Sequence, residues 1–148
     1  MKIPVDIRIR RERMGLDPKK PNEIEETENY LVSGAMKKTK HGYRIEFNET
    51  AGEIFTTVDT YGDSTVNINR VGPINTHMVF MDGKVLTCIC NTGFTPFQIN
   101  VRTKQLTNTL TPEGGRIDIR YSVEIHGNLA EKSRLVLSVS PDASIIKS

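Results

Sequence analysis

The sequence has little of what helical, disulfide-bonded or metal-binding proteins require. Its 148 residues include no tryptophan, two cysteines and three histidines. Alanine and leucine together number only 12, whereas the β-branched isoleucine, valine and threonine number 41. Because β-branched side chains lose rotamer freedom in a helix but pack well on a pleated sheet, this balance excludes a helical bundle and predicts an all-β protein. The length fits a single domain over residues 1–148.

Long apolar runs are also missing, and none approaches the roughly 18 residues of a membrane span. The N-terminus carries charges at Lys2, Asp6 and Arg8, where a secretory signal needs an unbroken apolar stretch. We therefore expect a cytoplasmic protein without a membrane partner. The formal net charge of +2 is too small to imply an obligatory nucleic-acid partner.

Charge is nevertheless unevenly distributed near the N-terminus. Residues 1–20 carry a local charge of +4, and the glutamates within residues 21–30 carry −4. The two blocks neutralise each other if they face across a hairpin, which gives a solvated, self-compensating pair of strands. The alternative is an arm that contacts RNA or phosphate through the basic N-terminal strand.

Alternation of apolar and polar residues, the period of a half-buried strand, recurs along the chain. Residues 11–29 break it and are predicted to form a charged connection, and residues 141–148 are predicted to form a tail. About eight to ten strands follow one another through short turns, which indicates an antiparallel meander. Closing the meander into an up-and-down β-barrel removes its exposed edges, so this is the fold we expect.

Residues that carry chemistry are few. Cys88 and Cys90 lie on the same face of a predicted strand, but no further soft ligands accompany them, so we expect buried reduced thiols. No Gly-x-Ser-x-Gly motif occurs, and Gly114-Gly115 lacks the lysine of a phosphate-binding loop. We therefore expect neither an enzyme nor a bound metal or cofactor.

Several segments together resemble one bacterial family. They are Gly34, residues 43–49, Arg70-Val71-Gly72, residues 78–83, residues 114–121 and Ile125-His126-Gly127. Their order over residues 31–139 resembles the YwiB-like proteins, a family named for an uncharacterised protein of calycin-like fold. The resemblance implies a calycin-like, or lipocalin-like, barrel, an intracellular bacterial setting and no assigned activity. The long connection at residues 11–23 and Pro96, at a position where glycine is expected, depart from the family pattern.

The inward face of such a barrel decides whether it binds a ligand, because eight to ten strands enclose room for side chains or one small molecule. Arg70 continues the apolar face of Val66 and Ile68, and a buried guanidinium needs an anion or several carbonyl groups. Its partner is either the carboxylate of a ligand or an internal glutamate. Tyr43 and Tyr121 share apolar strand faces and are either core residues or ligand contacts. Arg70, Tyr43 and Tyr121 are the candidate ligand-binding residues.

Two neighbouring strands, 77–81 and 85–90, are apolar on both faces. If one face of each strand packs in the core, then Val79, Met81, Val85 and Ile89 point outward together. Such a patch indicates a partner, most simply a second copy of the chain, unless the connection at residues 11–29 covers it.

The sequence thus predicts an architecture better than a function. The leading hypothesis is a non-enzymatic barrel that binds a small apolar or anionic ligand in its interior. The alternatives are a homodimeric interaction module without an internal ligand and an RNA-contacting protein.

Overall fold

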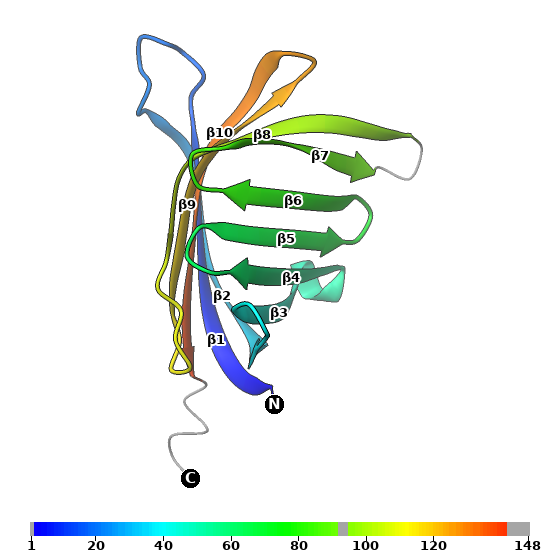
Figure 1. Cartoon of the computed structure of the whole chain (residues 1–148). Coiled ribbons are helices and arrows are strands. Elements are labelled where there is room, and N and C mark those ends of the chain that lie inside the picture. The colour runs from blue at the N-terminus through cyan, green and yellow to red at the C-terminus, as the bar shows by residue number, and fades with distance from the viewer. Residues whose placement is uncertain (1, 92–94, 142–148) are drawn as a thin grey trace.

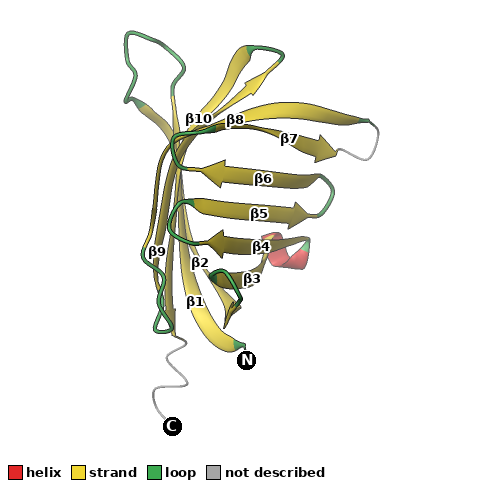
Figure 2. Ribbon diagram, viewed as in Figure 1, coloured by secondary structure: helices red, strands yellow, loops and turns green. Residues whose placement is uncertain are grey.

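The protein folds into a closed antiparallel β-barrel (Figures 1 and 2), seen in a computed structural model that describes residues 2–91 and 95–141. The strands are β1 (Ile3–Met14), β2 (Ile24–Lys38), β3 (Tyr43–Glu49), β4 (Ile54–Tyr61), β5 (Thr65–Val71), β6 (Asn75–Met81), β7 (Val85–Asn91), β8 (Pro96–Asn108), β9 (Gly115–Ile125) and β10 (Asn128–Pro141). Each strand pairs with its neighbours in the sequence, and β1 closes the barrel against β10. The predicted all-β, up-and-down barrel is therefore confirmed.

The described residues contain a single short 3₁₀ turn, Thr50–Gly52, between β3 and β4. None of them forms a helix long and apolar enough to cross a membrane. We call the end of the barrel at residues 15–23, 50–53 and 72–74 the charged end, and the end at residues 39–42, 62–64 and 82–84 the apolar end.

The predicted connection at residues 11–29 is wrong, because most of this segment is a hairpin. Strand β1 continues to Met14 and β2 begins at Ile24, so only residues 15–23 connect the two strands. The register places Arg11 opposite Glu28 and Arg13 opposite Glu26, with N···O distances of 4.0 and 3.4 Å. Cross-strand ion pairs replace apolar alternation here. The predicted neutralisation of the two charge blocks across a hairpin is thus confirmed.

Strand lengths at the other end of the sequence also differ from the prediction. Strand β10 includes Pro141, and the remaining residues of the predicted tail, 142–148, lie outside the described residues. Strand β8 runs unbroken from Pro96 to Asn108, although the alternation of its buried residues changes phase before Leu106. A register shift between Thr103 and Gln105 explains this, because a β-bulge reverses the apolar alternation without ending the strand.

The pairing of β6 with β7 is short. The chain turns at Asp82-Gly83, and Gly83 has the positive φ of 73° that such a turn favours. The two strands pair only near the charged end, where Asn75 to His77 lie opposite Asn91 to Ile89. Closer to the turn, the Val79 N–H donates to Cys88 Sγ at 3.4 Å. The barrel wall therefore has few interstrand bonds along this seam.

Most of the barrel interior is a continuous apolar cluster, to which every strand contributes inward residues. Val5, Ile7, Ile45 and Ile119 are completely buried. Cys88 and Cys90 are buried and free, which confirms their prediction as reduced core thiols. Position 34 requires glycine, because a Cβ there would lie 2.3 Å from the Glu46 carbonyl oxygen.

Candidate functional site

The inward-facing rows of four strands change from apolar to charged residues toward the same end of the barrel. On β1 the row Val5, Ile7 and Ile9 continues as Arg11 and Arg13, because alternate residues of a strand share one face. The corresponding charged residues on the other strands are Glu49 on β3, Arg70 on β5 and Glu131 on β10. The fold thus gathers charges from strands far apart in the sequence inside one end of the barrel.

Glu49 is the most deeply buried of these charges, at 5% exposure. Its Oε1 accepts a hydrogen bond from the Tyr30 hydroxyl, and its Oε2 accepts from Thr56 Oγ1 at 2.5 Å and Arg70 Nε at 3.2 Å. Burial by itself raises the pKa of Glu49, but these hydrogen bonds and the charges of Arg70 and Arg11 outweigh it and hold the pKa below its ordinary value. Glu49 is therefore a buried carboxylate that stays ionised.

Two tyrosine hydroxyls complete the polar part of this region. Burial, together with the Glu49 carboxylate, raises the pKa of Tyr30 to about 12. Burial, together with the charge of Glu131, raises the pKa of Tyr121 to about 12. The Tyr121 ring packs edge-to-face on Phe80, with 4.8 Å between centroids. Both hydroxyls consequently stay protonated at neutral pH and can donate hydrogen bonds.

A cavity of about 220 Å³ opens among these residues. Its polar lining comes from the charged residues Arg11, Arg13, Arg70 and Glu131, together with Thr76 and Tyr121. Its apolar lining comes from Ile68, Met78, Phe80 and Leu135. Three cations against one carboxylate give the lining an excess of positive charge.

The arginines of the cavity are not fully used by the protein. Glu49 is the ion-pair partner of Arg70 within the described part of the chain, and only Nε of Arg70 donates a hydrogen bond there. The closest carboxylate oxygen to Arg11 belongs to Glu28 and lies 4.0 Å away. The Nη groups of Arg70 therefore remain available to an anion that enters the cavity.

The structure brings together two of the three candidate ligand-binding residues. Arg70 and Tyr121 line the same cavity. Tyr43 lies at the apolar end instead, where the Lys38 ammonium sits 5.9 Å from its ring centroid. Its backbone N–H donates to Thr60 Oγ1 at 2.9 Å. The internal glutamate considered as an alternative partner of Arg70 is present as Glu49.

Sequence reasoning missed the other charges of the cavity. Arg11 and Arg13 follow Ile3 to Ile9 with the same period of two, but the prediction of a connection from residue 11 onward removed them from the barrel. Glu131 follows a β-bulge between Leu129 and Glu131, which shifts the alternation. The two-residue alternation of the first strand, continued from Ile9 for four more residues, would have placed both arginines on the inward face.

The candidate interface residues lie on the outer face of β6 and β7. Val85 and Ile89 are 44% and 56% exposed, and Val79 and Met81 are half-buried. The β1–β2 hairpin lies across the barrel in the strand order, so it does not cover them. Further exposed apolar side chains occur on the same wall at Phe55, Val71 and Ile74.

Among residues 2–91 and 95–141, no three histidine, cysteine, aspartate or glutamate side chains are grouped as metal ligands. Comparison with curated proteins finds no match. The crystal structure of the ywiB protein from Bacillus subtilis is similar, with a TM-score of 0.79 over 96% of this chain and 94% of that chain. The two sequences are 14% identical, so this likeness shows the fold alone. The model of a domain of unknown function, DUF1934, matches residues 17–137. The chain therefore belongs to the DUF1934 family and is YwiB-like, in agreement with the resemblance seen in its sequence.

Proposed function

We propose that the barrel binds a small organic anion in the cavity at its charged end. The observation that carries this proposal is Arg70, whose Nε is held by buried Glu49 while its Nη groups have no hydrogen bond in the described chain. A guanidinium fork matches a carboxylate through two parallel hydrogen bonds. Met78 and Phe80 provide apolar contacts for the rest of the ligand.

The size of the cavity limits the ligand. About 220 Å³ lies below the roughly 300 Å³ at which ordinary ligand pockets begin, so a short carboxylate fits better than a long fatty acid. In this proposal the barrel holds its ligand in the interior, as calycins do. We also propose a cytoplasmic location, which is supported by the two free cysteines.

We propose binding without catalysis because the titratable groups are shifted away from neutral pH. A general base is most effective with a pKa near 7. The pKa of Glu49 is instead lowered, and both Tyr30 and Tyr121 have a pKa raised to about 12. These residues are suited to hold charge and donate hydrogen bonds.

The test combines native mass spectrometry of protein purified from its host with calorimetric titration of hexanoate. The variant is Arg70→Lys, which keeps the charge but loses the planar fork. The control is Arg8→Lys, an exposed arginine on the outer face of β1. We expect a retained anion or hexanoate binding in the wild type and the control, and about tenfold weaker binding in Arg70→Lys, a loss of about 1.4 kcal/mol. A wild type that neither retains an anion nor binds hexanoate would overturn the proposal.

A second candidate function is self-association through the outer face of β6 and β7. It is favoured by the exposure of Val85 and Ile89 on a wall that also exposes Phe55, Val71 and Ile74. Light scattering should give twice the 16.6 kDa monomer mass for the wild type and the monomer mass for Ile89→Glu. Leu31→Glu, an exposed position on β2, should remain dimeric. A wild-type monomer rules out this function.

A further inference from the structure

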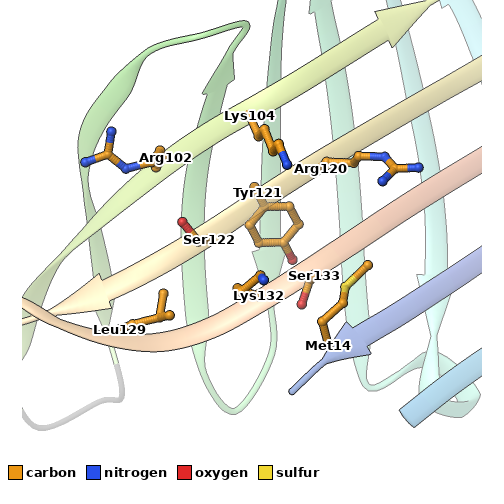
Figure 3. Close-up of a pocket in the computed structure, with 9 residues that line it drawn as sticks. All are labelled: Met14, Arg102, Lys104, Arg120, Tyr121, Ser122, Leu129, Lys132 and Ser133. Carbon is orange, nitrogen blue, oxygen red and sulfur yellow. The ribbon is translucent and has the colours of Figure 1, made fainter. Parts of the chain in front are cut away.

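A second cavity, also of about 220 Å³, lies on the outer surface of the barrel wall formed by β8, β9 and β10 (Figure 3). Arg102, Arg120 and Lys132 line it and face away from the barrel interior, because their sequence neighbours Val101, Ile119 and Ser133 are buried inside. Lys104 lines it as well. This outer pocket is therefore separate from the interior cavity, although Tyr121 contributes to both.

Register shifts in two strands shape the outer pocket. The register shifts between Thr103 and Gln105 on β8 and between Leu129 and Glu131 on β10, on either side of the pocket. A bulge bends its strand and increases the local twist. In Figure 1 the turn of the β9–β10 hairpin bends away from the rest of the barrel.

The outer pocket is lined by four cations and no acidic residue. Arg102 Nε lies 3.7 Å from Glu124, and Lys132 Nζ donates to the Pro21 carbonyl at 2.7 Å. Lys104 and Arg120 form neither a hydrogen bond nor an ion pair with the residues that the structure describes. Two positive charges of the pocket thus have no hydrogen-bond or ion-pair partner in the described part of the chain.

Arg120 lies opposite another arginine in the sheet. The register places it directly opposite Arg134 on β10. Like charges in directly opposed positions of a sheet destabilise the pairing. The nearby carboxylate of Asp118 attracts Arg120, but both of its oxygens already accept hydrogen bonds from Arg134, at 3.0 and 2.7 Å, and Arg120 forms no hydrogen bond with it. An anion in the outer pocket would offset this repulsion.

We propose that the outer pocket binds the phosphate group of a small molecule. A phosphate monoester carries about 1.5 to 2 negative charges at neutral pH, which matches the two unpartnered cations, whereas a single carboxylate matches one. Arg120 supplies a fork of N–H donors, and Ser122 adds a hydroxyl to the lining.

Nucleic acid is a less suitable ligand for this pocket. Proteins that bind single strands stack bases on aromatic side chains. The aromatic residue in the outer pocket is Tyr121, whose ring is buried against Phe80 inside the barrel. The pocket therefore offers charge for a phosphate but no exposed aromatic ring on which a base could stack.

The experiment is an NMR titration of backbone amides with inorganic phosphate at constant ionic strength, with acetate as the reference anion. Phosphate should shift the amides of residues 102–104 and 120–122, and acetate should bind at least about tenfold more weakly. The double variant Lys104→Gln with Arg120→Gln should bind phosphate about tenfold more weakly, which corresponds to about 1.4 kcal/mol. The matched control, Lys84→Gln with Arg116→Gln, removes the same charge from exposed positions outside the pocket and should change the affinity less than about twofold.

Three results would overturn the proposal. Acetate and phosphate could bind equally well, or the control variant could weaken binding as much as the pocket variant, which would indicate only a diffuse positive field. A ten-residue oligouridylate could bind far more tightly than phosphate and shift the amides of Arg8 and Arg10, which would indicate a nucleic-acid surface. Arg70→Lys should leave the phosphate titration unchanged, so the outer pocket is tested independently of the interior cavity.

Discussion

The two halves of the barrel interior are built by the same strands from different residues. At the apolar end, Val5 and Ile7 on β1 pack against the inward residues of the other strands and are completely buried. At the charged end, the same row of β1 presents Arg11 and Arg13. The backbone ladder continues through both halves, so the ladder does not depend on an apolar interior. The apolar half provides most of the hydrophobic stabilisation, and the lining of the charged half carries an excess of positive charge.

Burial of the charges decreases toward the rim of the charged end. The side chain of Glu49 is 5% exposed, that of Arg70 is 32% exposed and that of Arg13 is 51% exposed. Because solvent screens exposed pairs, the energetic cost of removing a residue should fall along this series. Substitutions in the two halves measure this gradient.

The largest effect is expected in the apolar half. Ile7→Ala should lower the free energy of unfolding by about 2–5 kcal/mol, because it removes a fully buried side chain and leaves a cavity. Chemical denaturation measures the change. Leu31→Ala, at a position 58% exposed on β2, is the control and should change stability by less than about 0.5 kcal/mol. Equal losses in both variants would contradict the assignment of the core to this end.

An intermediate effect is expected for Glu49→Gln. The amide keeps the shape of the side chain but loses the charge that pairs with Arg70. We expect the free energy of unfolding to fall by about 1.5–3 kcal/mol at neutral pH, the range for hydrogen bonds to charged groups. Denaturation at pH 7 measures the loss, and Glu46→Gln, which removes a carboxylate from the outer face, provides the matched control.

The pH dependence of stability identifies the same carboxylate. The folded state lowers the pKa of Glu49 from its ordinary value of 4.5, so its contribution is present above pH 4.5. That contribution is lost as the pH falls from 4.5 through the lowered pKa of the folded state. The difference in stability between wild type and Glu49→Gln should shrink over this acidic range. A difference that stays constant would show that the ionised form of Glu49 is not what stabilises the barrel.

Much of this architecture could be predicted from the sequence, and the failures have physical causes. Alternation along the strands indicated the barrel, and it placed Arg70 on an inward face. The prediction failed at Arg11 and Arg13, because residues 10–13 are charged on both faces of the strand and the alternation of apolar and polar residues disappears there. The outer pocket could not be predicted, because it depends on bulges in β8 and β10 that bring Lys104 beside Arg120.

The smallest effect is expected at the rim. Arg13 pairs with Glu26 at 3.4 Å and Glu131 at 3.7 Å, but its side chain and that of Glu26 are both about half exposed. Arg13→Gln should therefore lower the free energy of unfolding by no more than about 0.2–1 kcal/mol, and added salt should remove most of the difference. Denaturation at low and high salt measures both quantities, with Arg8→Gln on the outer face as the control. A loss as large as that of Glu49→Gln would show that the charged end is closed to solvent in solution. In that case its arginines are committed to the fold and are not available to a ligand.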